Sequence, residues 1–437
     1  MRKTRFFYGK KLLLSLCLVW LALLNEAAYL NLKQKQEEVQ TIKENVNEIT
    51  EEKVKEEQKV QQEKDTLSPK ESEKESPHIR VLLMDSAYET YFHPYVTVVC
   101  QGEEITYTPE SPELSEQPVV LEAGEEGITV PSIERQEGAP CYSGSLKIER
   151  QKEGLILVNE LPLEEYLKAV VPSEMPSSYE QEALMAQAVC ARTYAYKQIE
   201  EGRLKEYGAD VDDSVNFQVY RNIPPSKSTT KAVLETEGEI ICQNGEPIEA
   251  YYFSTSSGTT STDEVWGAVE AASYLKSVPC TFDSQETWSA WSVEIPWSQM
   301  QTQADAYTGE NAALQDIQVT KKSQSGAVIG LLAVTEEGSI EVSSEYDIRE
   351  FLSPKDCMIT GKDGTEIPGQ NLLPSAYFTM EVKKGESVCL KGSGYGHGVG
   401  MSQNGANEMA KEGYSYQEIL NYFFKDIEIV QAQTIAG

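Results

Sequence analysis

The sequence predicts an α+β protein: a mixed, β-rich body with helices around one cleft, preceded by an N-terminal membrane anchor and a charged stalk that is helical or disordered. Three observations support this prediction. An apolar run and then a highly charged segment open the chain. Short β-favouring runs follow between turn residues. Two capped helical pairs, far apart in the sequence, carry the two most distinctive motifs, so we expect the ends of the body to meet at one site.

Residues 1–30 carry the features of an export signal or a membrane anchor. Five basic residues, Arg2, Lys3, Arg5, Lys10 and Lys11, precede the apolar run 12–24, and no acidic residue occurs before Glu26. This charge pattern places the N-terminus in the cytoplasm and the body outside the cell membrane. The run is shorter than the ~20 residues that span a bilayer, but residues 27–30 extend it and no good A-x-A cleavage site follows. We therefore expect a retained single-pass anchor, with cleavage as the alternative.

Residues 31–78 form the predicted stalk, in which nearly all side chains are Lys, Glu, Gln, Asn, Thr or Ser. A partial heptad pattern of Leu, Val and Ile favours a helix, but Lys53, Glu56 and Glu63 interrupt its apolar seam. A charged disordered spacer is the alternative. Either form would hold a globular body away from the membrane.

The body is predicted to contain a β-rich accessory region over 79–140 and a larger domain over 141–431. Runs at 80–84, 95–100 and 146–148 favour strands and alternate with turns rich in Gly, Pro and acidic residues. The pairing of the eight cysteines stays open, because their spacing shows no dense disulfide framework. The formal net charge of −32 argues against a nucleic-acid partner, since phosphate backbones bind basic surfaces.

The first motif surrounds Glu174. A helix is predicted over 163–170 and should stop before Pro172, because proline disfavours helical geometry in the residue before it. A longer helix should begin at one of the serines at 177–178, each of which has Glu or Gln three residues on, and end at Gly202.

Glu174 would then lie on an elbow between two prolines, flanked by Val171 and Met175. Apolar surroundings raise the pKa of a carboxyl group, which makes Glu174 a candidate general acid. A surface glutamate at a helix start is the alternative. Arg192, on the longer helix, either faces back toward the elbow or is solvated or salt-bridged.

The second motif is the glycine-dense loop 394–400, which contains His397, one of only three histidines. Glycine adopts left-handed backbone and lets a ligand come close, so His397 is a candidate site residue, with a structural turn as the alternative. The sequence has no His-x-x-x-His or Cys-x-x-Cys pair for a zinc shell. We therefore expect no metal and no other cofactor.

The rest of the body is predicted to be mixed. Residues 314–382 combine β-like runs with a short helix near 346–352. After the glycine loop, one helix should run over 402–411 with Gly413 as its cap, and a capping box at 415–418 should start a second.

Together these motifs resemble the stage II sporulation protein D and amidase-enhancer (SpoIID/LytB) family. The resemblance extends over roughly residues 141–429 and is carried by seven segments: Val171–Pro176, Ala186–Ala195, Phe217–Tyr220, Ala250–Gly258, Val265–Gly267, Asn371–Phe378 and Gly396–Ala406. Two residues depart from the family pattern. Ser257 stands where relatives often have glycine, and Cys190 where they usually have alanine, and neither touches the proposed acid.

The resemblance implies a membrane-anchored peptidoglycan lytic transglycosylase that acts during engulfment in sporulation. Family members cleave MurNAc-GlcNAc bonds of glycan strands that a partner cell-wall amidase has stripped of peptides, alongside other engulfment proteins. The glutamate of the Ser-Glu-Met motif, Glu174 here, is the implied catalytic acid. It would protonate the bridging oxygen and then, as carboxylate, take the proton of the sugar's C6 hydroxyl, which leaves 1,6-anhydro-muramyl ends.

Substrate-binding or positioning roles are expected for a wider set of residues: His397, Arg192, Gly396, Gly398, Ser402, Gln403, Tyr251 and Tyr252. The imidazole and the loop backbone would position the strand or stabilise charge. The two tyrosines and Trp266 would offer stacking surface, with core packing as the alternative for each. Because stripped strands keep lactyl carboxylates, Arg192, Lys391 or His397 should bring positive charge to the cleft.

Two other classes of function stay open. The main alternative is a non-catalytic glycan-binding module that stimulates a cell-wall amidase. The other is a structural septal protein, in which Glu174→Gln would have no cost.

Overall fold

The computed structural model describes residues 77–135, 138–221, 223–309 and 312–432. The predicted anchor over 1–30 and the predicted stalk up to residue 76 lie outside the described residues. His78, the last residue assigned to the stalk, is the first residue of a strand. Within the described ranges, no helix combines the length and the apolar character that a bilayer span requires.

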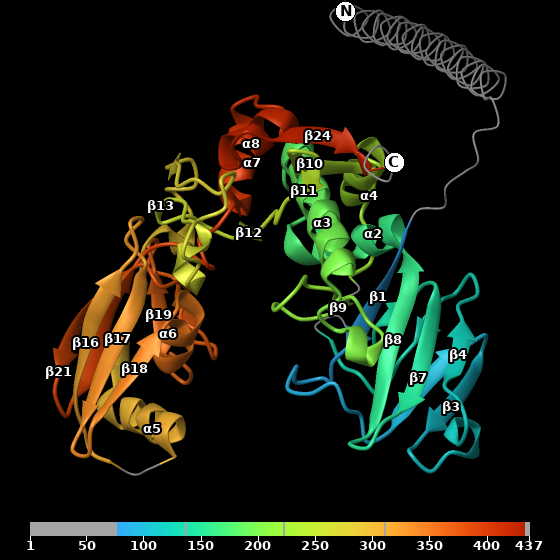
Figure 1. Ribbon diagram of the computed structural model, residues 1–437, viewed down its shortest axis with the longest axis horizontal. Helices are drawn as coiled ribbons and strands as arrows, with labels where there is room; N and C mark the ends of the chain where they lie inside the picture. The colour runs from blue at the N-terminus through green and yellow to red at the C-terminus, as the bar shows by residue number, and fades with distance from the viewer. Residues whose placement is uncertain (1–76, 136–137, 222, 310–311, 433–437) are drawn as a thin grey trace, which may run out of the picture. The chain divides into compact units, whose positions relative to one another are not determined.

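A five-stranded sheet opens the body (Figure 1). Its strands lie in the order β4 (Val119–Glu122), β7 (Ser145–Arg150), β8 (Leu155–Pro162), β1 (His78–Leu83) and β9 (Val211–Asp212). All neighbours are antiparallel except β1 and β9, which are parallel. Leu146 and Ile148 of β7 are buried because alternate side chains of a strand face one side. The sheet takes strands from both sides of residue 140, so the two predicted regions share it.

A four-stranded sheet contributes to the same hydrophobic core. Its order is β3 (Glu103–Tyr107), β2 (Val96–Cys100), β5 (Ile128–Thr129) and β6 (Cys141–Tyr142). The strands predicted at 80–84, 95–100 and 146–148 are confirmed as parts of β1, β2 and β7. The seven cysteines of the described residues are free thiols.

Helix α3 (Gln181–Glu201) is the centre of the helical part of the body. It contacts α2 (Leu163–Glu174), α4 (Lys227–Glu235), α7 (Gln403–Lys411), α8 (Tyr416–Phe423) and β10 (Glu239–Gln243). Residues 183–195 are buried on every face of α3, and their many alanines allow close packing. β10 pairs with β11 (Glu246–Pro247) and β24 (Glu428–Gln431), and β12 (Tyr252–Phe253) pairs in parallel with β23 (Met401–Ser402). Segments from both ends of the body therefore meet around α3.

The predicted stop of α2 before Pro172 is wrong. The helix continues through the proline to Glu174, and the backbone N–H of Met175 donates to the carbonyl of Val171 at 2.9 Å. Val170 and Val171 are fully buried. Core packing thus outweighs the local preference of a residue before proline.

The predicted start of α3 at residues 177–178 is also wrong. The helix begins at Gln181, and no serine caps it. The backbone N–H of Glu180, its N-cap, donates to Oδ1 of Asn407 on α7 at 2.9 Å. A contact with a distant helix therefore replaces the local capping box. The predicted end is confirmed, because Gly202 adopts the left-handed conformation with φ 60°.

A second hydrophobic core lies among two further sheets and two helices (Figure 1). One sheet has the order β20 (Glu366–Pro368), β19 (Met358–Gly361), β15 (Trp291–Pro296), β22 (Ser387–Gly392) and β21 (Phe378–Lys383). The other is β16 (Leu314–Lys322), β17 (Val328–Thr335) and β18 (Ser339–Ser343), and the helices are α5 (Trp297–Thr308) and α6 (Glu345–Phe351). The mixture predicted over 314–382, with a helix near 346–352, is confirmed.

Short elements complete the described part of the chain. β13 (Gly258–Thr259) pairs with β14 (Pro279–Cys280). The 3-10 helices are η1 (Pro112–Leu114), η2 (Lys205–Tyr207), η3 (Asp263–Trp266) and η4 (Thr287–Ser289).

The two predicted closing helices are confirmed. Ser402 is the N-cap of α7 and accepts the N–H of Gly405 at 3.2 Å, and Gly413 follows the helix with φ 95°. A capping box at 415–418 starts α8. The described body is thus α+β, whereas the single cleft stays a prediction.

Candidate active site around Glu174

Glu174 is the last residue of α2, and its carboxyl group meets segments that are distant in sequence. Its Oε1 accepts the backbone N–H of Val219 at 2.8 Å and the hydroxyl of Tyr252 at 3.2 Å. The side chain is half-buried. The helix end, the segment after β9 and strand β12 therefore hold one carboxyl group in a defined orientation.

The pKa of the Glu174 carboxyl group is raised from 4.5 to about 7. Burial is the main cause, because it disfavours the charged form. The hydrogen bonds from Val219, Tyr252 and Gln403 and the positive charge of Arg221 act in the opposite direction and only partly offset burial. Near neutral pH the group is populated in both forms, so it can donate a proton in one step and accept one in the next.

Gln218 orients the tyrosine that contacts Glu174. Its Nε2 donates to the hydroxyl oxygen of Tyr252 at 3.1 Å and to the carbonyl of Ala191 at 3.2 Å, while its Oε1 accepts the hydroxyl of Tyr166 at 3.2 Å. Because the Tyr252 oxygen accepts from Gln218, its own proton is directed to Glu174. Burial raises the pKa of Tyr252 well above 10, so the hydroxyl stays a donor.

Gln218, Val219 and Arg221 were not among the predicted site residues. The only sequence signal for Gln218 and Val219 was the segment 217–220, which contributed to the family resemblance but suggested no chemistry, and Arg221 lies just after it. A Gln-Val pair between two aromatic residues is a weak signal, and its hydrogen-bond partners become visible only in the folded chain.

The C-terminal motif reaches Glu174 through Gln403 at the start of α7. Nε2 of Gln403 donates to the backbone carbonyl of Glu174 and to Oε1 of Gln187, each at 3.3 Å. The structure therefore brings three predicted residues together: Glu174, Tyr252 and Gln403.

His397 lies in an aromatic cluster instead. Its ring is 5.0 Å from that of Trp266, 5.8 Å from Phe253 and 6.3 Å from Tyr251, measured between centroids. Tyr251 and Phe253 flank Tyr252, and alternate residues of an extended segment point to opposite sides. His397 and Glu174 therefore contact opposite sides of this segment.

The expectation that His397 brings positive charge to the site is wrong. Burial lowers the pKa of His397 to about 3, so the ring is neutral at physiological pH. Nδ1 accepts the backbone N–H of Val399 at 3.1 Å, which leaves the ring proton on Nε2. The neutral ring packs in the glycine loop and also hydrogen-bonds the backbone of Tyr252, whose hydroxyl donates to Glu174.

Backbone conformation and close packing explain the glycines of the loop 394–400. Gly396 and Gly398 have φ of 104° and 82°, and the N–H of Gly396 donates to the carbonyl of Pro374 at 2.8 Å. A Cβ at Gly398 would overlap the hydroxyl of Tyr377. The Ser402 hydroxyl, besides capping α7, donates to the buried carboxylate of Asp283 at 2.6 Å. These contacts match the structural-turn alternative for the loop.

Arg192 is engaged away from Glu174. It is fully buried, and its Nε and Nη2 bind both carboxylate oxygens of Glu164 at 2.7 and 2.8 Å. Its Nη1 donates to the carbonyl of Glu239 at 3.1 Å. The salt-bridged alternative is the one that the structure shows, and Arg192 is not part of this site. Lys391 is exposed on β22.

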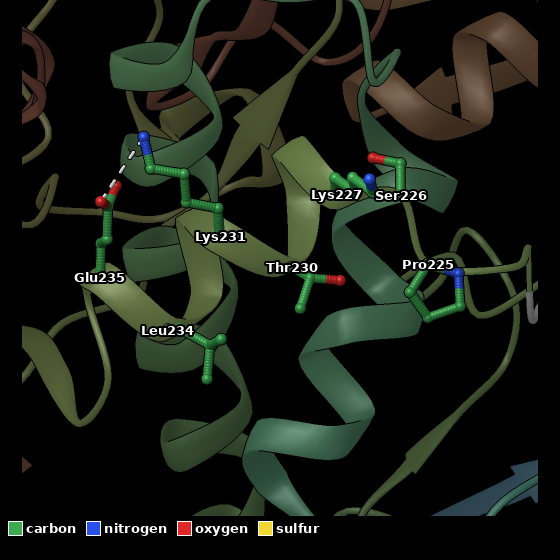
Figure 2. Close-up of a pocket in the computed structure, with 7 residues that line it drawn as sticks. All are labelled: Pro225, Ser226, Lys227, Thr230, Lys231, Leu234 and Glu235. Atoms are coloured by element: carbon green, nitrogen blue, oxygen red, sulfur yellow. Dashed lines mark ion pairs between the residues drawn. The ribbon is translucent and has the colours of Figure 1, made fainter. Parts of the chain in front are cut away.

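A shallow depression lies on α4 (Figure 2). It is lined by Pro225, Ser226, Lys227, Thr230, Lys231, Leu234 and Glu235, and Lys231 forms an ion pair with Glu235 at 3.6 Å. The hydroxyl of Ser228 donates to the carbonyl of Ser177 at 2.7 Å, which ties α4 to the segment that follows Glu174. Basic side chains of this protein thus occur close in sequence to the Arg221 that influences Glu174.

Known proteins are similar to this chain in the regions described above. A family described as "Stage II sporulation protein" matches residues 151–242, and a domain of unknown function (DUF8618) matches residues 271–400. Stage II sporulation protein D of Bacillus subtilis (strain 168) is 32% identical over 289 residues, or 63% of this chain and 76% of the relative. An uncharacterized protein of Brachyspira hyodysenteriae is 30% identical, over 78% of this chain and 87% of its own. The amidase enhancer of Bacillus subtilis is 30% identical, over 59% of this chain and 39% of its own.

Proposed function

The chain belongs to the stage II sporulation protein D family, and we propose that it is a lytic transglycosylase that cleaves peptide-stripped peptidoglycan strands during engulfment. The observation that carries the proposal is the carboxyl group of Glu174. Its pKa lies near 7, and two hydrogen bonds hold it in place. We further propose that residues 1–30 anchor the body on the outer side of the cell membrane.

The reaction uses Glu174 twice. The protonated carboxyl group gives its proton to the bridging oxygen as the bond from the muramic acid C1 to that oxygen breaks. The resulting carboxylate then takes the proton of the C6 hydroxyl of the same sugar, whose oxygen bonds to C1. The products are a free hydroxyl on the leaving sugar and a 1,6-anhydro ring, and no water is consumed.

The surroundings of Glu174 support a mechanism with one carboxyl group. Ordinary glycoside hydrolysis requires a second carboxylate about 5 to 9.5 Å away as nucleophile or base. In the described part of the chain, the groups that set the pKa of Glu174 are the Val219 amide, Tyr252, Gln403 and the cation of Arg221. A carboxylate is not among these largest contributions, which is consistent with a single catalytic carboxyl group. We assign the nucleophile to the C6 hydroxyl of the sugar, as the family resemblance implies.

The charge of the substrate gives Arg221 a role. Peptide-free strands carry lactyl carboxylates, and a protein with a net charge of −32 repels them except where cations gather. Arg221 acts on Glu174 electrostatically, and Lys227 and Lys231 line the depression on α4. We assign the lactyl groups to this basic side of the site, in place of the Arg192 and His397 expected from the sequence.

Product analysis tests the proposal. Full-length protein in detergent is incubated with peptide-free glycan strands in H₂¹⁸O, and the ends are identified by mass spectrometry. Wild type should form 1,6-anhydro-muramyl ends without ¹⁸O, and Glu174→Gln should lower the rate at least about 100-fold, the usual cost of losing a general acid. Reducing ends that contain ¹⁸O would instead show a hydrolase.

A second candidate is a non-catalytic glycan-binding protein that stimulates an amidase. The similarity to a relative named amidase enhancer favours it. This function predicts no anhydro ends from wild type, and it predicts a rise in the rate of a purified cell-wall amidase that Glu174→Gln preserves.

A further inference from the structure

We propose that Tyr395 and Trp288, which Asn404 and Thr255 connect to Tyr179, form a separate sugar-binding subsite that holds a neutral N-acetylamino sugar of the strand away from the bond cleaved at Glu174. The inference rests on the proposed function for the identity of the strand. It adds a binding surface that lies outside the contacts of the carboxyl group.

The subsite is an aromatic pair at the surface. The rings of Tyr395 and Trp288 are 4.8 Å apart between centroids and tilted by 48°. Trp288 packs partly against the second core, whereas Tyr395 is 37% exposed. Aromatic rings of this kind offer a large apolar face with a polar edge, which suits the alternating CH and OH groups of a pyranose ring.

The pair is held rigidly by the backbone. Tyr395 and Thr255 exchange two backbone hydrogen bonds, of 2.8 and 3.1 Å. The N–H of Gly394 donates to the carbonyl of Trp288 at 2.8 Å, and the indole of Trp291 donates to the carbonyl of Gly394 at 3.0 Å. A surface ordered before binding loses little conformational entropy when a ligand arrives.

A chain of hydrogen bonds connects the pair to the segment that follows Glu174. Tyr179 lies five residues after Glu174, and its hydroxyl bonds Oδ1 of Asn404. Nδ2 of Asn404 donates to Oγ1 of Thr255 at 2.9 Å, and Thr255 pairs with Tyr395. One asparagine therefore links Tyr179 to Thr255, whose backbone pairs with that of Tyr395.

The charge near the pair selects a neutral sugar. Glu286 precedes Trp288 by two residues, and Glu286 and Glu408 both act on the Tyr179 phenol to raise its pKa. Lys411 also acts on Glu286, but it is ion-paired with Glu408 at 2.6 Å, so Glu286 is left as the net charge of this group. A carboxylate here repels the lactyl group of muramic acid but not an N-acetylglucosamine unit. The basic residues at 221–231 would then bind muramic acid units and this acidic subsite N-acetylglucosamine units. Together they would fix which bond of the glycan strand lies at Glu174.

Binding in an inactive background tests the subsite. Full-length Glu174→Gln protein is titrated by calorimetry with a chitin tetrasaccharide, which is neutral, and with peptide-free glycan strands. Tyr395→Ala in that background should weaken binding of both about five- to tenfold, the loss expected for one stacked aromatic ring. Tyr395→Phe should keep the affinity.

Tyr307→Ala is the matched control. Tyr307, on α5, is similarly exposed (42%), and its ring meets edge-on, at 5.4 Å between centroids, the ring of Phe351 in the second hydrophobic core. Equal affinities of the Tyr395→Ala and Tyr307→Ala proteins would overturn the subsite. A loss for muramic-acid strands alone would overturn its assignment to a neutral sugar. This test measures binding and not cleavage, so its result does not depend on transglycosylase activity. If wild type forms no anhydro ends but the Tyr395 variants behave as expected, only the proposed function fails.

Discussion

Removing the Tyr252 hydroxyl should raise the pKa of Glu174 further. In Tyr252→Phe the ring keeps its shape, and the carboxylate loses the donor that lies 3.2 Å from its Oε1. A hydrogen bond to a charged group contributes ~1.5–3 kcal/mol, and this rather long bond belongs at the lower end. Since ~1.4 kcal/mol corresponds to one pH unit, the pKa should rise by about one unit from its value of about 7.

The assay is the pH dependence of kcat/KM on peptide-free strands, which reports the free enzyme. A general acid must be protonated, so activity falls as pH rises through its pKa. Loss of a donor to the carboxylate strengthens proton binding, so the alkaline limb should move upward by about one pH unit in Tyr252→Phe. Tyr251→Phe, whose ring contacts His397 on the other side of the segment, should leave the limb in place. An unchanged or downward-shifted limb in Tyr252→Phe would refute the reasoning.

Three further predictions concern stability and are checked by urea denaturation. The pKa of Glu174 in the folded protein lies above its usual 4.5, so wild type loses stability as pH rises from about 4.5 through about 7. The free energy of unfolding of Glu174→Gln should match that of wild type at pH 4.5 and exceed it by about 2–3 kcal/mol at pH 8. Equal values at pH 8 would contradict the raised pKa. Arg192→Met should lower the free energy of unfolding by about 3–5 kcal/mol, because Glu164 stays charged and mostly buried without its partner. A loss under 1 kcal/mol would count against this ion pair. Gly398→Ala should lower the free energy of unfolding more than Gly267→Ala does. Both glycines have positive φ, but only a Cβ at Gly398 would meet another side chain. Equal losses would rule out the clash.

Local patterns predicted the parts of the fold that depend on neighbouring residues. The end of α3 at Gly202 and the cap of α7 at Ser402 involve groups within a few positions of each other, so their chemistry is readable in sequence. The boundaries that failed depend on distant partners. Asn407 receives the N–H of Glu180 across 227 positions, and no local rule anticipates that contact.

In the candidate site, too, the features set by neighbouring residues were predicted and those set by distant residues were not. The apolar neighbours of Glu174 indicated the correct direction of its pKa change, because burial is the main cause. Its hydrogen-bond donors come from Val219 and Tyr252, 45 and 78 positions away, and remained hidden. For His397 the expected positive charge is wrong, because the aromatic rings that bury it come together only after folding. Its positioning role stays a prediction.

Direct titration of the Glu174 carboxyl group tests the central claim. Infrared difference spectra of wild type minus Glu174→Gln isolate the C=O band of this one carboxylic acid. The band of the protonated acid should be present at pH 6, fall to half its intensity near pH 7 and vanish by about pH 9. A band already lost at pH 5.5 would show an ordinary ionised glutamate, which could not act as the acid.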